Sequence, residues 1–139
     1  MDQFVADSAA EIASRAQREL EALVAVSSPS GDIDGAEEAI ALCAAFLPPE
    51  AAIERAESST PGSAPDLIAA IRGRGAGRVL LLGHLDTVIA HRSHAPLRRD
   101  GNRLYGPGAV DMKGGVVLAL GVARALATRP ERFAEVAVL

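Results

Sequence analysis

The apolar residues of the chain recur with two different periods, which predict two kinds of element. Three segments repeat apolar positions every three or four residues, the spacing of an amphipathic helix. Shorter apolar runs bounded by glycine, proline or serine are typical of strands. The predicted helices span residues 2–26, 33–47 and 112–128, and the predicted strands span residues 51–57, 66–72, 78–83 and 133–139. Helices that alternate with strands predict a layered α/β domain.

The most apolar run of the chain is Val79-Leu80-Leu81-Leu82. A continuous run of this kind fits a strand that is covered on both faces, so we expect it at the centre of the sheet. Residues 84–110 follow as a long polar connection that contains all three histidines. Because connections of this length inside a compact domain are usually functional or disordered, this one is a candidate location for the site.

Composition narrows the class of protein. The 139 residues are 49% hydrophobic and 23% charged, as in one soluble globular domain, and only 3% are aromatic, so the core must be aliphatic. The net charge of -4 disfavours non-specific nucleic-acid binding, which needs a basic surface. We therefore expect no nucleic-acid partner.

Cysteine usage and the amino-terminal residues indicate a compartment. Cys43 is the only cysteine, which excludes an intrachain disulfide and a zinc site built from cysteines. It lies in an apolar helical stretch, so we interpret it as a buried structural thiol. The pattern of a signal peptide is absent, and no apolar run approaches the roughly 20 residues of a membrane span. We expect a cytoplasmic protein without membrane contact.

Candidate chemistry begins where the strand predicted at residues 78–83 ends, in Gly83-His84-Leu85-Asp86-Thr87-Val88. Residues two apart on an extended backbone point the same way, so His84 and Asp86 share one side. Imidazole is a good metal ligand, and a nearby carboxylate can fix its orientation and raise its basicity. Open α/β sheets bind ligands at the carboxyl ends of their strands. The alternative is structural, with His84 ending the strand and Asp86 capping the following turn.

A second motif places one aspartate among glycines just before a predicted helix. Its sequence is Tyr105-Gly106-Pro107-Gly108-Ala109-Val110-Asp111-Met112-Lys113-Gly114-Gly115. Glycine permits backbone conformations and close approaches that a bound ligand can require. The carboxylate of Asp111 can therefore bind a metal and bridge two ions. The competing interpretation makes Asp111 the N-cap of the helix, a common position for aspartate.

Other chemistries fail on their sequence patterns. A phosphate-binding loop needs Gly-Lys followed by Ser or Thr, whereas the order here is Lys113-Gly114-Gly115. The glycines of residues 73–77 precede a strand, whereas a dinucleotide fingerprint follows one. Neither the Gly-x-Ser-x-Gly elbow of a serine hydrolase nor a His-Glu-x-x-His zinc motif occurs. His91 and His94 match no strong metal motif, and we expect both to be exposed loop residues.

Taken together, the motifs at residues 84–88 and 105–115 resemble the first half of a superfamily of dizinc amidohydrolases. It comprises glutamate carboxypeptidase, acetylornithine deacetylase, succinyl-diaminopimelate desuccinylase and aminoacylase. Residues 23–31, a helix end followed by Ser-Pro-Ser-Gly, are also similar to the amino-terminal element of that superfamily. The resemblance implies that residues 1–139 are the N-terminal portion of a phosphorylase/hydrolase-like three-layer α/β/α zinc-peptidase catalytic domain with a mixed sheet. The lid or dimerisation domain and the C-terminal part would be absent.

The same resemblance assigns roles to three residues. His84 would ligate one zinc ion, Asp111 would bridge two zinc ions, and Asp86 would be the catalytic carboxylate that orients His84. It also implies a cis peptide bond between Asp111 and Met112. Cobalt or manganese would suit such ligands as well.

The implied reaction is hydrolysis of an amide or peptide bond in a small peptide or an N-acyl amino acid, by a carboxypeptidase- or deacylase-type metallohydrolase. The full-length protein would form a homodimer. The Glu-Glu pair that the superfamily carries after the strand beginning near Phe133 is not in the sequence, which ends at Leu139. We therefore expect an inactive fragment that binds zinc weakly. Two alternatives stay open: an N-acyl-amino-acid deacylase of the same superfamily, or a truncated, non-catalytic interaction module.

Overall fold

The computed structural model describes residues 2–139 and places a helix or a strand in every segment where the sequence predicts one. The helices are α1 (Gln3–Ala25), α2 (Ile33–Phe46) and α3 (Lys113–Ala127). The strands of the main sheet are β1 (Ala52–Ala56), β2 (Asp66–Arg72), β3 (Arg78–Leu81) and β6 (Glu135–Val138). The elements that the sequence did not predict are the hairpin strands β4 (Arg98–Asp100) and β5 (Arg103–Tyr105) and the 3-10 turns η1 (His91–Ser93) and η2 (Pro130–Arg132).

Aspartate side chains begin the first two helices. The Asp2 carboxylate accepts a hydrogen bond from the backbone N–H of Phe4 at 3.0 Å. The Asp32 carboxylate accepts one from the N–H of Gly35 at 2.8 Å. Each bond satisfies a donor that a helix N-terminus otherwise leaves unpaired. The segment between α1 and α2 therefore ends with the aspartate that caps α2.

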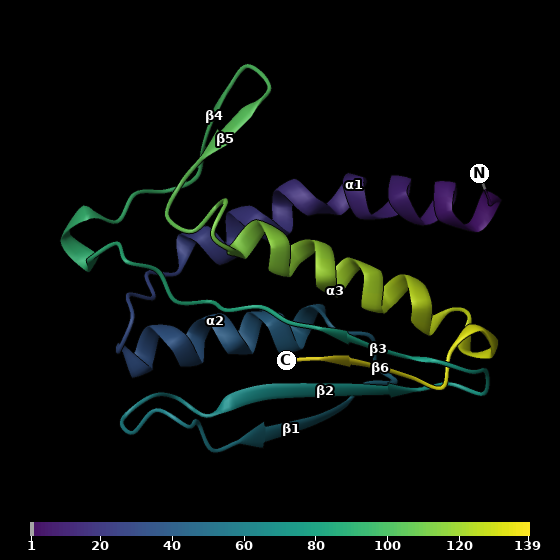
Figure 1. Cartoon of the computed structure of the whole chain (residues 1–139). Helices are drawn as coiled ribbons and strands as arrows, with labels where there is room; N and C mark the ends of the chain where they lie inside the picture. The colour runs from purple at the N-terminus through teal and green to yellow at the C-terminus, as the bar shows by residue number, and fades with distance from the viewer. Residues whose placement is uncertain (1) are drawn as a thin grey trace.

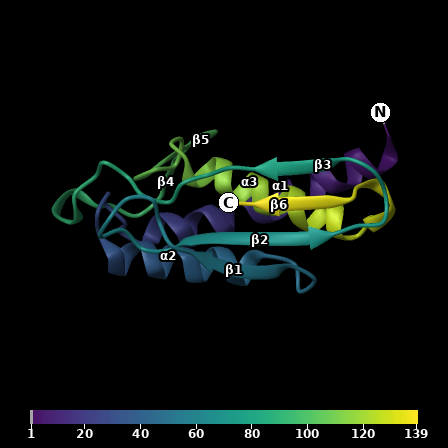
Figure 2. The same ribbon diagram turned by 60° about the horizontal axis from the view of Figure 1, so that its bottom comes forward.

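The four-stranded sheet is mixed and has the order β1-β2-β6-β3. Strand β6 pairs antiparallel with β2 and parallel with β3, so that Val138 lies between Ala69 and Leu81. All three helices cover the same face of this sheet (Figures 1 and 2). The predicted α/β class and mixed sheet are confirmed, and residues 2–139 supply one helical layer and the sheet.

The core lies between the helices and the covered face of the sheet, and it is aliphatic as predicted. Leu23 and Val24 of α1, Leu120 of α3 and Val136 of β6 are all at most 1% exposed. Cys43 is also buried, and burial raises the pKa of its thiol to about 12, which confirms a structural thiol. No helix within residues 2–139 has the length and hydropathy to cross a membrane.

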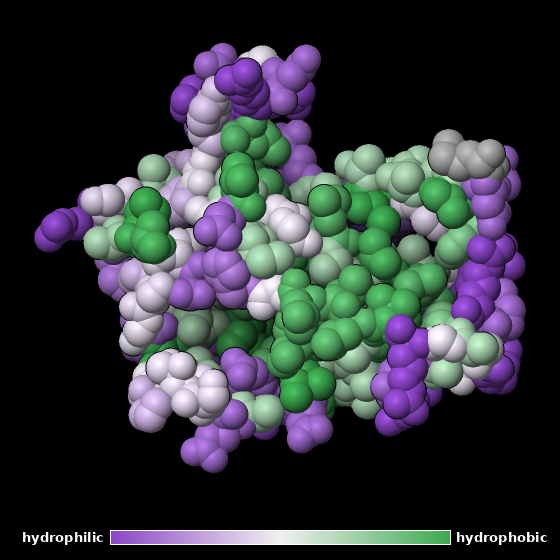
Figure 3. Space-filling model, viewed as in Figure 1, coloured by the Kyte–Doolittle hydropathy of each residue, from purple (hydrophilic) through white to green (hydrophobic). Residues whose placement is uncertain are grey.

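The predicted central position of the 78–83 strand is wrong for the described residues. Strand β3 lies at the edge of the sheet, where it pairs with β6 alone. Leu80 is 59% exposed and Leu82 is 60% exposed. A broad apolar area lies over α3 and β3 (Figure 3). Leu118 of α3 is 52% exposed. The apolar run has the composition of a strand with neighbours all round. Among residues 2–139, however, β3 has one neighbouring strand, and helices cover only one face of its sheet (Figure 2).

Candidate metal-binding site

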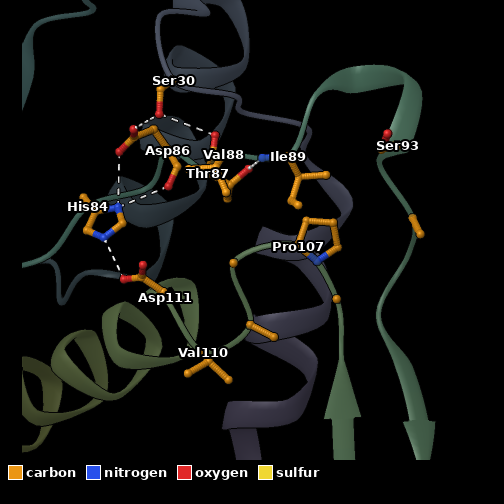
Figure 4. Close-up of a pocket in the computed structure, with 14 residues that line it drawn as sticks. Ser30, His84, Asp86, Thr87, Val88, Ile89, Ser93, Pro107, Val110 and Asp111 are labelled. Carbon is orange, nitrogen blue, oxygen red and sulfur yellow. Dashed lines mark hydrogen bonds and ion pairs between the residues drawn. The ribbon is translucent and has the colours of Figure 1, made fainter.

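Two segments far apart in the chain converge beyond the carboxyl end of β3. The first follows β3 directly and carries His84 and Asp86, and the second is the glycine-rich turn that leads into α3 and carries Asp111 (Figure 4). The His84 Nε2 atom lies 3.1 Å from the Asp111 Oδ1 atom. Two donors on one tetrahedral zinc ion, each about 2.0–2.2 Å from the metal, stand about 3.3–3.6 Å apart, a few tenths of an ångström more than this separation. The predicted proximity is present, at a separation that suits a shared cation.

The other ring nitrogen of His84 faces Asp86. The His84 Nδ1 atom lies 3.1 Å from the Asp86 backbone carbonyl oxygen and 3.2 Å from the Asp86 Oδ1 atom. The two side chains therefore share one side of the chain, as their spacing predicts. These acceptors hold a proton on Nδ1, so Nε2 can bind a metal through its lone pair once it gives up the proton that it donates to Asp111 in the metal-free chain.

The electrostatic surroundings of His84 favour a cation. Desolvation by burial lowers the pKa of the imidazole, but other contributions outweigh this effect. The hydrogen bond to Asp111, the backbone hydrogen bond at Asp86 and the charges of both carboxylates raise the pKa above its usual 6.5. The two carboxylates beside the ring favour a positive charge at Nε2, whether a proton or a metal ion supplies that charge.

The interpretation of Asp111 as a helix N-cap is wrong. The N-cap position of α3 is Met112, and its side chain makes no capping hydrogen bond. The Asp111 carboxylate is 87% exposed and accepts from His84. The peptide bond between Asp111 and Met112 is cis, as the family resemblance implies.

A buried lysine lies beneath the Asp111 turn. Lys113 is 0% exposed, and its Nζ atom donates to the carbonyl oxygens of Leu23 at 3.0 Å and Val26 at 2.8 Å. Burial lowers the pKa of this amine. These two acceptors lie at the end of α1, where carbonyl groups lack partners within the helix and a positive charge is favoured. Lys113 therefore joins the turn that carries Asp111 to the end of α1.

The connection between α1 and α2 runs alongside the segment after β3. The Ser30 N–H donates to the Thr87 carbonyl oxygen and the Thr87 N–H donates to the Ser28 carbonyl oxygen, both at 2.9 Å. The Ser28 hydroxyl donates to the Leu85 carbonyl oxygen at 2.7 Å. The Ser30 hydroxyl donates to the Asp86 Oδ2 atom. The His84–Asp86 segment is thus fastened on one side by a short stretch of parallel pairing.

Sequence reasoning missed the roles of Ser30 and Lys113. In the sequence, Ser30 stands only in the Ser-Pro-Ser-Gly stretch after the first predicted helix, and Lys113 only in the glycine-rich motif. Their partners are 56 and 90 positions away in the chain. The one local signal was the single lysine of the sequence standing two residues after the candidate ligand Asp111.

The two remaining histidines differ from each other. His91 is exposed, as predicted, and its Nδ1 atom lies 2.8 Å from the Ser27 hydroxyl oxygen. The prediction of an exposed His94 is wrong, because its Nε2 atom is buried without a hydrogen-bond partner among the described residues. His94 follows the 3-10 turn η1 directly, and its N–H donates to the His91 carbonyl oxygen. Neither histidine joins His84 and Asp111.

The site opens into a pocket of about 440 Å³. The residues that line it include His84, Asp86 and Asp111 and the apolar Val88 and Val110 (Figure 4). No group of three or more His, Cys, Asp or Glu side chains within residues 2–139 could hold a metal ion. A zinc site uses three or four protein ligands, so the described donors fit part of such a site.

The fold and the site define the class of a mixed α/β protein with an imidazole and a carboxylate paired at the carboxyl edge of its sheet. Residues 80–139 match the model of Peptidase family M20/M25/M40. Carboxypeptidase G2 from a Pseudomonas species is 34% identical over 108 residues, which cover 73% of this chain and 25% of that protein. These matches confirm the relationship to the peptidase family that the motifs predict.

Further relatives agree with this relationship. A Mycobacterium tuberculosis protein whose name describes a succinyl-diaminopimelate desuccinylase is 50% identical over 50 residues, which cover 36% of this chain and 14% of that protein. The solved structure of the di-peptidase Dug1p from Saccharomyces cerevisiae matches with a TM-score of 0.73 at 16% identity, over 97% of this chain and 33% of that one. This likeness shows the fold. The chain spans about a quarter of carboxypeptidase G2 and a third of Dug1p.

Proposed function

We propose that this chain forms part of the catalytic domain of a zinc-dependent hydrolase that cleaves an amide or peptide bond. The enzyme would be of the carboxypeptidase or deacylase type, acting on a small peptide or an N-acyl amino acid. One observation carries the proposal: His84 Nε2 and Asp111 Oδ1 lie 3.1 Å apart at the carboxyl edge of the sheet. The match of residues 80–139 to a peptidase family supports it. A cytoplasmic location and a homodimeric full-length protein stay predictions.

In this proposal His84 Nε2 and Asp111 Oδ1 would be two of the ligands of a zinc ion. The bound metal would polarise the scissile carbonyl group and lower the pKa of a bound water. Asp86 holds the His84 ring through Nδ1, so that Nε2 points to Asp111. Asp111 is 87% exposed, which leaves room for its carboxylate to reach a second ion. Cobalt and manganese suit the same donors.

Two ligands do not make a tight zinc site, so the proposal includes further ligands from outside this sequence. The backbone pairing next to His84 indicates where such ligands would lie. The Gly83 N–H donates to the Leu139 carbonyl oxygen at 2.9 Å, which sets Leu139 beside the residue that precedes His84. In a longer chain, residues joined to Leu139 would enter the space next to His84. The 139-residue chain alone would be inactive and would bind zinc weakly.

The incomplete ligand set also favours a second candidate, a non-catalytic interaction module. The two candidates differ in what His84 and Asp111 do. In a hydrolase domain they bind the metal together, whereas an interaction module has no need of either donor. An N-acyl-amino-acid deacylase shares the site with the leading proposal and differs from it only in substrate.

A zinc titration of the metal-free chain by calorimetry tests the proposal. We expect one weak binding event that His84→Ala and Asp111→Asn each abolish. His91→Ala is the matched control, because it removes an exposed histidine that does not reach Asp111. The proposal fails if the chain takes up no zinc, or if His84→Ala leaves uptake intact. A nanomolar site for two ions in the isolated chain would contradict the incompleteness of the ligand set.

A further inference from the structure

The backbone fixes Ser30 beside the candidate site independently of its side chain. Its N–H donates to the Thr87 carbonyl oxygen, and the Thr87 N–H donates to the Ser28 carbonyl oxygen, both at 2.9 Å. Pro29 and Thr87 form a parallel β-bridge between these bonds. An alanine at position 30 can make the same backbone contacts. The Ser30 hydroxyl adds to this attachment only a long hydrogen bond, 3.4 Å to the Thr87 carbonyl oxygen.

The hydroxyl of Ser30 donates to one oxygen of Asp86 while the other oxygen faces His84 (Figure 4). Asp86 Oδ1 lies 3.2 Å from His84 Nδ1, and the hydroxyl holds Oδ2. With a partner on each oxygen, the carboxylate cannot rotate without losing one of them. Ser30 itself is exposed, so this bond is not needed to satisfy a buried polar group.

We propose that Ser30 is a positioning residue that sets the rotation of the Asp86 carboxylate against His84 Nδ1, and through it directs His84 Nε2 toward Asp111. The inference rests on the proposed metal-binding function and extends it by one residue. It orders three side chains in a line: Ser30 orients Asp86, Asp86 orients His84, and His84 meets Asp111. Partners behind a metal ligand fix its tautomer and orientation, and their removal weakens metal binding.

The test compares Ser30→Ala with two matched variants of the same chain. Ser30→Thr keeps a hydroxyl at the position. Ser93→Ala removes a hydroxyl from the opposite side of the same pocket (Figure 4). Three measurements are made on each protein: thermal unfolding, the zinc dissociation constant by calorimetry, and long-range ¹H–¹⁵N spectra of the metal-free His84 ring.

We expect Ser30→Ala to unfold at the same temperature as Ser93→Ala. Its zinc dissociation constant rises about three- to tenfold, less than the 10- to 100-fold typical of a group that touches the ligand itself. The nitrogen spectra show a smaller share of the proton on His84 Nδ1. Ser30→Thr retains the behaviour of the unmodified chain, and Ser93→Ala changes neither property.

Two results overturn the inference. One is a Ser30→Ala spectrum and zinc affinity equal to those of Ser93→Ala. The other is a loss of thermal stability in Ser30→Ala that accounts for the weaker binding, since the hydroxyl would then be structural. Absence of zinc binding to the unmodified chain would count against the proposed function, while the metal-free spectra would still decide the role of Ser30.

Discussion

The two segments that meet at the candidate site are held in opposite ways. The segment after β3 is fastened by backbone pairing of residues 28–30 with residues 85–87, in which Ser28 and Thr87 are buried, and by the exposed Ser30 hydroxyl. The turn before α3 is fastened from below, by the fully buried Lys113 amine on the last carbonyl groups of α1. The first attachment uses several hydrogen bonds between uncharged backbone and hydroxyl groups, together with the exposed Ser30–Asp86 bond, whereas the second uses one desolvated charge.

Because of this difference, we expect one attachment to contribute mainly to the stability of the fold and the other mainly to the orientation of the site's side chains. A buried donor whose removal orphans two acceptors affects the whole fold, because each unsatisfied group costs about 1–3 kcal/mol. An exposed hydroxyl contributes little to folding but restricts a rotation. The Asp111 side is therefore expected to be sensitive in stability, and the His84 side in geometry.

The largest expected effect breaks the buried attachment. Lys113→Met keeps the length of the side chain and removes the donor to Leu23 and Val26, so the free energy of unfolding falls by about 2–3 kcal/mol. Urea denaturation measures it. Leu118→Met is the control, because it introduces the same residue at an exposed position of α3. Equal free energies of unfolding for the two variants would show that the Lys113 hydrogen bonds do not stabilise the fold.

A smaller loss of stability is expected from a substitution at Gly108, where the two segments are in contact. Gly108 has a φ of 71°, and a Cβ atom there would lie 2.8 Å from Thr87 Cγ2. Gly101 has a φ of 57° and open space around it. Both alanine variants bear the strain of a left-handed residue, about 1–2 kcal/mol. Gly108→Ala should lose at least ~1 kcal/mol more in urea denaturation. Equal losses would mean that the segments do not press together there.

The smallest effect concerns the charge of His84 in the metal-free chain. Asp111→Asn removes an acceptor that raises the pKa of the imidazole, so this pKa falls toward 6.5. With a raised folded-state pKa, His84 stabilises the fold fully below its unfolded value of about 6.5, and this contribution is lost as the pH rises through the folded value. An NMR titration of the ring measures the shift. Asp100→Asn in the β4–β5 hairpin is the control, and an equal shift there would refute the pairing.

The sequence predicts the main elements well because their signals are local. Apolar period and helix caps lie within one element, and they predict α1, α2 and α3 to within a few residues. The β4–β5 hairpin was missed because its strands have three residues each and carry mostly charged side chains. The edge position of β3 was missed because an apolar run indicates burial without saying which neighbours supply it.

The residues of the candidate site also divide into those that local sequence predicts and those that it does not. His84, Asp86 and Asp111 stand in short motifs whose chemistry is visible in a few consecutive residues. Ser30 and Lys113 act on partners that only the folded chain brings near, and nothing in the neighbouring sequence names those partners. Pairings of this range depend on how α1, α3 and β3 pack, which sequence periodicity does not specify.

The hydrogen bonds from the Lys113 amine to Leu23 and Val26 couple the unfolding of two helix ends, the first turn of α3 and the last turn of α1. Fraying of the last turn of α1 would withdraw the acceptors of Lys113, and unwinding of the first turn of α3 would withdraw the donor. Amide hydrogens at these two helix ends should therefore exchange with deuterium at matched rates, as members of one cooperative unit. The Asp111 turn would then be ordered only while both ends are closed.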